Sequence, residues 1–150
     1  MTTILVCIDG SEGAVRAARA GVGVLRPADT VLVVTVVEGT DPALAYDGTG
    51  HAGPTMTDTQ FDAFRQEELR NAQVIVDETI KQLGLENQLG RVIEGTAGPE
   101  LCALARAEQA SAIVMGSRGR GRLKRALLGS VSDYVVRNAP CPVVVVGERP

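Results

Sequence analysis

The hydrophobic pattern of the chain switches repeatedly between two periods. Five short runs, separated by longer amphipathic segments, are rich in β-branched and other apolar residues, and three of them are continuous. They cover residues 3–9 (TILVCID), 30–38 (TVLVVTVVE), 90–95 (GRVIEG), 111–116 (SAIVMG) and 141–147 (CPVVVVG). Strands that are apolar on both faces are typical of parallel sheets covered by helices on each side. The pattern therefore predicts five strands of a parallel sheet.

The segments between these runs place apolar residues at helical spacing. They predict helices over 12–25, 61–83, 99–109 and 131–139. Ser11 is a candidate N-cap of the first helix, and Gly84 stops the second, which is the longest. Gly21 and Gly23 each cost the first helix about 1 kcal/mol relative to alanine. We therefore expect that close packing of this helix on the sheet requires them.

The predicted elements alternate strictly from strand to helix. Pro99 is well placed as the first residue of the third helix, and Ser130 can cap the fourth, which Pro140 terminates. Right-handed crossovers then produce a doubly wound α/β sheet with helices on both faces. Ligands of such sheets bind beyond the carboxyl ends of the strands, at the point where the strand order reverses.

Residues 39–60 fit neither pattern. The segment GTDPALAYDGTGHAGPTMTDTQ is rich in Gly, Thr, Asp and Pro, and it is longer than most connections in compact domains. It follows the second predicted strand, on the side of the sheet where a ligand is expected. A mobile lid and a disordered, neutral insertion are equally compatible with this composition.

Composition and charge narrow the function classes. The 150 residues are 45% hydrophobic and 22% charged, which is typical of one globular domain. The net charge of −3 argues against a general nucleic-acid-binding protein, which carries a basic excess. The amino-terminal sequence lacks a signal-peptide pattern, and no apolar run approaches the ~18 residues of a membrane span. We therefore expect a cytoplasmic protein that does not bind membranes.

The three cysteines, Cys7, Cys102 and Cys141, are far apart in the sequence, and each lies in or beside apolar residues. Their spacing does not fit a metal site. The only histidine, His51, lies in the Gly-rich segment rather than beside a candidate nucleophile. We expect reduced thiols with a structural role in the core.

Residues 115–132 (MGSRGRGRLKRALLGSVS) combine glycines with basic residues directly after the fourth predicted strand. The segment lacks the Walker A spacing and the glycine order of a dinucleotide-binding turn. Its glycines suggest a loop that leaves the strand, surrounds an anion and returns. The N–H groups of Gly129, Ser130 and Val131 would then face phosphate at the start of the fourth helix. The hydroxyls of Ser130 and Ser132 add donors.

The spacing G-x2-G-x9-G-[ST], matched by Gly116, Gly119, Gly129 and Ser130, resembles the ATP-binding branch of the universal stress protein family. The resemblance covers essentially the whole chain, including VCIDGS near its start and GSVSDYVVRNAPCPVVVV near its end. It implies a Rossmann-like, adenine nucleotide alpha hydrolase-like fold, in which a five-stranded parallel sheet has the order 3-2-1-4-5.

The resemblance also implies further ligand contacts. Asp9, at the end of the first strand, is expected to hydrogen-bond the ribose hydroxyls, although it is also placed to cap the first helix. The backbone of Val36, or of Val37 if the register differs, is expected to contact adenine. Met115 would lie beside the nucleotide, and it fits a core position equally well.

The basic residues of the glycine-rich segment admit two interpretations. We expect Arg118 to contact the phosphates and the remaining four to face solvent. Those four are Arg120, Arg122, Lys124 and Arg125. A nucleic-acid site would need aromatic platforms, and aromatic residues make up only 3% of the chain.

The resemblance predicts an ATP-binding stress sensor or signalling module, with Mg²⁺ accompanying the nucleotide. We expect slow hydrolysis at most, because no Walker lysine, acidic metal pair or general base is evident. A nucleotide-free interaction module and an adenylyl-transferring enzyme of the related superfamily are the alternatives, and ATP, AMP and a cyclic nucleotide all stay open as the ligand.

The implied strand order also bears on assembly. It makes residues 142–146 (PVVVV) an edge strand without a guarding charge. Family members commonly pair through this strand, so we expect a homodimer in which the edges of two copies meet across a two-fold axis.

Overall fold

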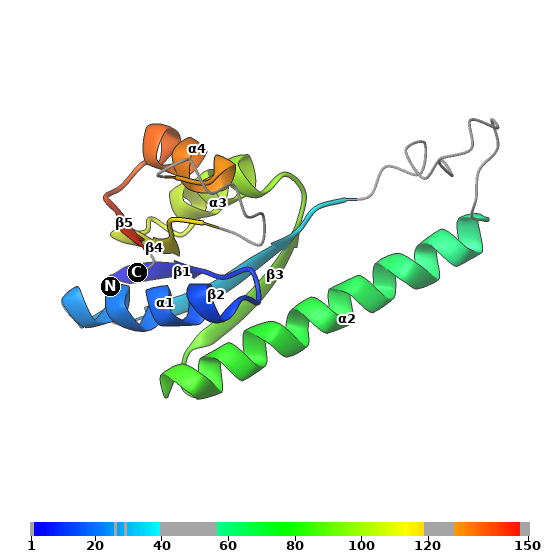
Figure 1. Cartoon of the computed structure of the whole chain (residues 1–150), viewed down its shortest axis with the longest axis horizontal. Helices are drawn as coiled ribbons and strands as arrows, with labels where there is room; N and C mark the ends of the chain where they lie inside the picture. Colours follow the sequence, from blue (N-terminus) through cyan, green and yellow to red (C-terminus); the bar gives the residue numbers. More distant parts are fainter. Residues whose placement is uncertain (1, 26, 29, 40–56, 119–127, 148–150) are drawn as a thin grey trace.

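The computed structural model describes residues 2–25, 27–28, 30–39, 57–118 and 128–147 (Figure 1). Its strands are β1 (Thr3–Cys7), β2 (Thr30–Val37), β3 (Leu89–Glu94), β4 (Ala112–Gly116) and β5 (Val143–Val146), and its helices are α1 (Glu12–Val24), α2 (Asp58–Leu83), α3 (Ala97–Ala107) and α4 (Ser130–Asn138). The strands form one parallel sheet in the order β3-β2-β1-β4-β5. The predicted doubly wound α/β fold and the strand order 3-2-1-4-5 are confirmed.

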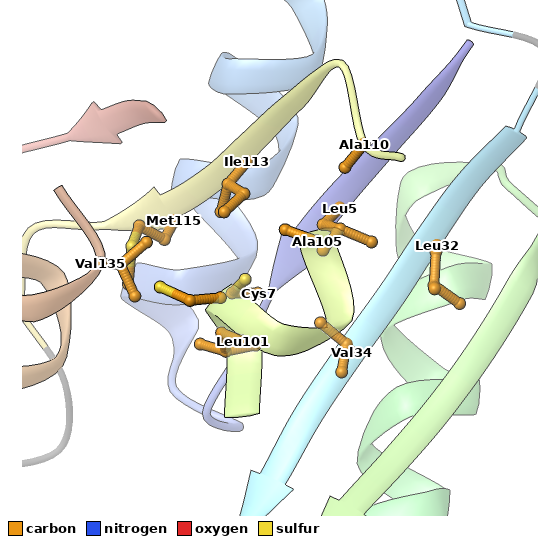
Figure 2. Close-up of a cluster of buried hydrophobic side chains, with 11 residues drawn as sticks. Leu5, Cys7, Leu32, Val34, Leu101, Ala105, Ala110, Ile113, Met115 and Val135 are labelled. Carbon is orange, nitrogen blue, oxygen red and sulfur yellow. The ribbon is translucent and has the colours of Figure 1, made fainter. Parts of the chain in front are cut away.

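Two apolar layers cover the opposite faces of the sheet. Alternate residues of β1 divide between them, since Leu5 and Cys7 pack with α3 and α4, whereas Ile4 and Val6 pack with α1 and α2. Figure 2 shows the first layer, the α3/α4 core, in which Leu101 of α3 packs against side chains of the strands. The second layer is the α1/α2 core. Because both faces of the central strands are buried, their sequences read as continuous apolar runs.

The start of α2 differs from the prediction. The helix begins at Asp58 rather than at Phe61, because Thr57 and Gln60 form a reciprocal capping box. Residues 58–60 of the predicted loop are therefore helical, and residues 40–56 of that loop lie outside the described residues. The helix ends as predicted at Gly84, whose φ of +68° is left-handed. Within the described ranges, no helix combines the length and apolar character needed to cross a bilayer.

The other helix starts are set by local signals of different kinds. The hydroxyl of Ser11 accepts a hydrogen bond from the N–H of Ala14 at 3.1 Å and caps α1, as predicted. α3 begins at Ala97, two residues before the predicted Pro99, with Thr96 as its N-cap. Proline fits inside the first turn because the N–H that it lacks would have no helical partner there.

The predicted Ser130 cap of α4 is wrong. Gly129 is the N-cap, with the extended conformation of a cap residue (φ −74°, ψ 166°), and Ser130 is the first helical residue. Among the described residues, no side chain caps the first turn of α4 through a hydrogen bond. This helix therefore begins without the side-chain cap that α1 and α2 have.

Gly21 lies where α1 packs on β4. A β-carbon at this position would overlap Cγ1 of Val114, a side chain that is completely buried. The expected packing role is confirmed for Gly21. It is wrong for Gly23, because nothing lies within 4 Å of a β-carbon built there.

We expect Gly21→Ala to lower the free energy of unfolding by about 1–3 kcal/mol, because the added methyl group forces Val114 or the helix to shift. Gly23→Ala is the matched control and should raise the free energy of unfolding by about 0.4–1 kcal/mol, since alanine restricts the unfolded chain and favours the helix. Urea unfolding of the two variants measures both signs. Equal effects at the two positions would contradict the packing role of Gly21.

Candidate functional site

A cleft of about 900 Å³ opens at the carboxyl ends of the strands. The ends of β2, β1 and β4, which are neighbours in the sheet, form its base, and α1, α2, α3 and α4 contribute to its walls. The strand order reverses between β1 and β4, so the cleft lies where doubly wound sheets bind ligands. Adjacent strands are ~4.8 Å apart, which separates the ends of β2 and β4 by about 10 Å.

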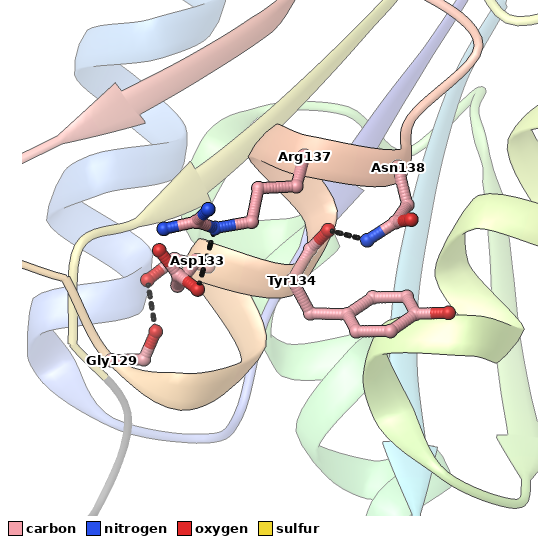
Figure 3. Close-up of polar contacts among 6 residues, drawn as sticks. Gly129, Asp133, Tyr134, Arg137 and Asn138 are labelled. Carbon is pink, nitrogen blue, oxygen red and sulfur yellow. Dashed lines mark hydrogen bonds and ion pairs between the residues drawn. The ribbon is translucent and has the colours of Figure 1, made fainter.

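The β4 side of the cleft is formed by the N-terminus of α4. The first hydrogen bond of the helix runs from the N–H of Asp133 to the carbonyl of Gly129 at 2.9 Å (Figure 3). The N–H groups of the three preceding residues, Ser130, Val131 and Ser132, therefore have no acceptor within the helix. All three residues line the cleft. Together with the helix dipole, their N–H groups favour an anion at this end.

The carbonyl of Ser117 holds the two ends of the glycine-rich segment together. It accepts hydrogen bonds from the N–H of Gly129 at 2.7 Å and from the hydroxyl of Ser132 at 3.0 Å. In turn, the N–H of Ser117 donates to the carbonyl of Val146 at 2.9 Å. We expected the Gly129 N–H and the Ser132 hydroxyl to face an anion, but both donate to the carbonyl of Ser117. Ser132 presents its backbone N–H to the cleft instead.

The β1 side of the cleft carries a carboxylate with one unpaired oxygen. Oδ1 of Asp9 accepts hydrogen bonds from the N–H of Ser11 at 3.0 Å and from its hydroxyl at 2.6 Å. Ser11 itself caps α1, so Asp9 supports the cap rather than forming it. Oδ2 of Asp9 is buried and has no hydrogen-bond partner among the described residues. A buried acceptor without a donor is costly, which indicates that this oxygen is placed for a ligand donor.

The β2 side of the cleft presents backbone groups. β2 continues to Val37, whereas β1 ends opposite Val34. The carbonyl of Val34 accepts the N–H of Ile8 at 2.9 Å, and the carbonyl of Val37 accepts the N–H of Gly95 on the opposite side at 3.0 Å. The backbone groups of successive residues in a strand point alternately towards its two neighbouring strands. The N–H and carbonyl of Val36 therefore point to the same side of β2 as β1 does, but beyond the end of β1. Val36, rather than Val37, presents a donor and an acceptor there.

The floor of the cleft is apolar. Cys7, Val34 and Met115 come from the three adjacent strands, and Leu101 reaches them from α3 (Figure 2). Met115 is only 6% exposed, so it is a core residue, and it also lines the cleft. Its two interpretations are therefore compatible.

Several predicted residues lie at the cleft, and others lie outside the described part of the chain. Gly116 and Arg118 line the β4 side together with Leu128. Gly119 and the basic residues between 120 and 125 lie outside the described residues.

Four polar side chains of the cleft were missed by the sequence analysis, and one of them is Thr35 on β2. Glu38 follows β2, and Glu68 and Asn71 lie on α2. On α2, Glu68, Asn71, Ala72 and Ile75 follow the spacing of one helix face, and all four line the cleft. The signal was weak, because polar residues in the middle of an amphipathic helix are typical of its solvent-exposed face.

The family comparison agrees with the fold. The sequence profile described as the universal stress protein family matches residues 1–147. The chain belongs to the universal stress protein family. A universal stress protein of Thermus aquaticus is 31% identical over 144 residues, which cover 96% of this chain and 97% of that protein. A second, from Methanocaldococcus jannaschii, is 28% identical over 143 residues, covering 95% of this chain and 80% of that protein.

Solved structures of the family share this fold. The universal stress protein UspA from Lactobacillus plantarum has a TM-score of 0.75 at 22% identity, with 97% of each chain covered. A universal stress protein in complex with cAMP has a TM-score of 0.60 at 22% identity, covering 97% of this chain and 95% of that one. A family member from Arabidopsis thaliana with AMP bound has a TM-score of 0.59 at 14% identity, covering 99% and 93%.

The cysteines are free thiols, as expected. Cys7 and Cys102 are buried in the α3/α4 core, and Cys141 packs against it. Burial raises the pKa of the Cys7 thiol to about 12, and the neighbouring thiols of Cys102 and Cys141 act in the same direction. Cys7 thus stays protonated at neutral pH although it lines the cleft.

The raised pKa of Cys7 predicts a loss of stability at alkaline pH. The unfolded chain releases this proton above a pKa of 9.0, whereas the folded chain keeps it up to about 12. The thiol's contribution is therefore complete below pH 9 and declines above it, by about 1.4 kcal/mol per pH unit, until the folded thiol titrates. Urea unfolding at several pH values should show a shallower decline in Cys7→Ala than in the unmodified protein. Parallel declines would contradict a protonated Cys7.

Proposed function

We propose that this protein binds ATP in the cleft and acts as a nucleotide-dependent stress sensor or signalling module in the cytoplasm. The observation that carries the proposal is the buried, unpaired Oδ2 of Asp9, which lies between an exposed strand edge and an uncapped helix N-terminus. A nucleotide has a hydrogen-bonding base, a ribose diol and an anionic phosphate in that order. Three free cysteines also suit a reducing compartment.

Each part of the nucleotide has a matching part of the cleft. The adenine would hydrogen-bond to the backbone of Val36 and lie on the apolar floor at Met115. The ribose hydroxyls would donate to Oδ2 of Asp9. The phosphates would lie at the N–H groups of Ser130, Val131 and Ser132, with Gly116, Arg118, Gly119 and Gly129 around them, and Mg²⁺ would accompany them. The span of about 10 Å between β2 and β4 suits this extended arrangement.

The nucleotides bound by structural neighbours support an adenine nucleotide. One neighbour is a complex with cAMP and another holds AMP. Both ligands share the adenine, the ribose and a phosphate with ATP, so the base and ribose contacts proposed here apply to all three. The α4 N-terminus and the basic residues of the glycine-rich segment favour the additional charge of a triphosphate.

We propose binding rather than rapid catalysis. Phosphoryl transfer needs a positioned nucleophile and a metal held by the protein in addition to a clamp for the phosphates. In the described part of the chain, no group of three His, Cys, Asp or Glu side chains is arranged to hold a metal ion. Hydrolysis of bound ATP is therefore expected to be slow.

The test combines ligand binding with a variant of Asp9. ATP at 100 times its dissociation constant should stabilise the fold by about 2.7 kcal/mol, seen as a raised melting temperature. Asp9→Asn keeps the oxygen that Ser11 contacts but removes the acceptor at Oδ2. It should weaken ATP binding by roughly 10- to 100-fold, the range for a hydrogen bond to a charged group, while leaving the melting temperature without ligand unchanged or higher.

The matched control is inorganic triphosphate, which has no ribose. Its affinity should be the same for Asp9→Asn and the unmodified protein, measured by isothermal titration calorimetry. An unchanged melting temperature of the unmodified protein in millimolar Mg-ATP would overturn the proposed function. Equal loss of ATP and triphosphate affinity in Asp9→Asn would contradict only the ribose contact.

We also propose that two copies pair through β5. This strand is an edge of the sheet, and its four valines are all half-buried within one chain. Val144 packs against the α1/α2 core and Val145 against the α3/α4 core, whereas Val146 belongs to neither. An unpaired valine edge invites a second strand, and antiparallel pairing about a two-fold axis covers it in both copies.

Val146→Lys should convert the dimer to a monomer, because pairing of the two edges would place a lysine charge from each copy in the interface. Val74→Lys, at a valine on α2 that is 53% exposed, is the matched control and should stay dimeric. Sedimentation velocity at tens of micromolar, on the order of weak-dimer constants, distinguishes the two masses. A monomeric unmodified protein under these conditions would rule out the dimer.

A further inference from the structure

The face of α2 that borders the cleft carries two polar side chains to which the nucleotide contacts proposed above give no role. Glu68 is half-buried and Asn71 is exposed, and both line the cleft beside the apolar Ala72 and Ile75. A carboxylate at the edge of a cleft for a polyanion is unfavourable unless the ligand brings a hydrogen-bond donor to it.

Two contacts fix the height of α2 along the sheet. Near its start, Arg65 binds both carboxylate oxygens of Glu94, at 2.5 and 2.8 Å, and Glu94 is paired with Val37 in the sheet. Nearer its end, Val76 packs on Gly90 so closely that a β-carbon there would overlap it. Gly90 is paired with Val33. Figure 1 shows α2 running along β2 and β3.

These contacts place Glu68 at the level of Val36. Glu68 precedes Val76 by eight residues, or about 12 Å of helix. Val36 follows Val33 by three residues, or about 10 Å of strand. Because α2 runs antiparallel to the strands, Glu68 lies across from the backbone groups that Val36 presents. Asn71 lies three residues further along the helix, about one turn further from the carboxyl ends of the strands.

We propose that Glu68 and Asn71 read the outer edge of the purine and select a 6-amino over a 6-oxo base. This inference rests on the proposed ATP binding and adds the means of base selection. The Glu68 carboxylate accepts a hydrogen bond from the exocyclic 6-amino group, whose other hydrogen faces the Val36 carbonyl. The Asn71 amide donates to N7, which is an acceptor in every purine.

The chemistry of position 6 explains the selection. A carboxylate is only an acceptor, so it pairs with the amino group of adenine and repels the carbonyl oxygen of hypoxanthine or guanine. An amide can present either its N–H₂ group or its oxygen. Replacing the carboxylate by an amide therefore removes the repulsion of a 6-oxo base while keeping the size of the side chain.

The experiment compares ATP with ITP, which differ only at position 6 of the base and the proton on N1. Isothermal titration calorimetry with the Mg²⁺ complexes gives the ratio of the two dissociation constants. Glu68→Gln should lower the preference for ATP by about tenfold, since an unpaired polar group at a recognition site is worth about this much or more. Asn71→Leu should weaken both nucleotides by similar factors and leave the ratio unchanged.

Glu67→Gln is the matched control, since it removes the same charge from the neighbouring, exposed position of α2. Its ratio should equal that of the unmodified protein. An unmodified protein that binds neither nucleotide would overturn the proposed function itself. An unmodified protein that binds ATP, together with a Glu68→Gln variant whose ratio is unchanged, would overturn base selection by Glu68 alone. Unweakened binding of both nucleotides by Asn71→Leu would overturn the role of Asn71.

Discussion

The cleft exists because the central strand ends before its neighbour. β1 stops at Cys7, opposite Val34, whereas β2 continues to Val37. The residues directly after β1 end the strand. Gly10 has a φ of +81°, a conformation that favours glycine, and it turns the chain towards the Ser11 cap of α1. Further strand residues would have paired with Val36 and filled the space. The turn that starts α1 therefore creates a polar strand edge inside an otherwise apolar sheet.

Among the described residues, the buried side-chain polar atoms around this gap divide into a paired framework and one unpaired oxygen. The hydroxyl of Thr35 is buried and donates to the carbonyl of Ile8 at 2.9 Å, where the sheet ladder has ended. Ser117 closes the other side through its contacts with Gly129 and Ser132. Since the framework satisfies its own hydrogen bonds, the gap is preorganised without a ligand. In the proposed function, the unpaired Oδ2 of Asp9 is the acceptor that remains for the ligand.

The sequence predicted the fold well because its strongest signals are long and redundant. The largely apolar runs at 31–37 (VLVVTVV) and 112–115 (AIVM) require burial on both faces, and this requirement leads to a parallel sheet with helices on each side. The strand order came from the family resemblance rather than from the runs. Helix starts were less predictable, because Thr57, Thr96 and Gly129 compete with equally plausible cap residues nearby.

The site was predictable only where it is local in sequence. Asp9 follows β1, and the glycine-rich segment that leads into α4 follows β4, and such positions point to the carboxyl edge of a doubly wound sheet. Glu68 and Asn71 have no such marker, since their place at the cleft depends on the height of α2 along the sheet, which is set by its packing on distant parts of the chain, such as Val76 on Gly90. The register of β1, β2 and β3 decides that Val36 rather than Val37 presents its backbone groups to the cleft. Strand register is a tertiary property.

The charges of the cleft are arranged so that an anionic ligand fits in one direction. Glu38 and Glu68 lie towards the β2 side, and Asp9 lies at the centre, whereas the N–H groups of α4 and Arg118 lie on the β4 side. Phosphate placed near the two glutamates would be repelled in a partly desolvated site, where charge interactions are stronger than in water. The same phosphate at α4 gains hydrogen bonds and a favourable dipole. For the proposed nucleotide, the polarity of the cleft, rather than its shape alone, therefore favours a base towards β2 and phosphate towards α4.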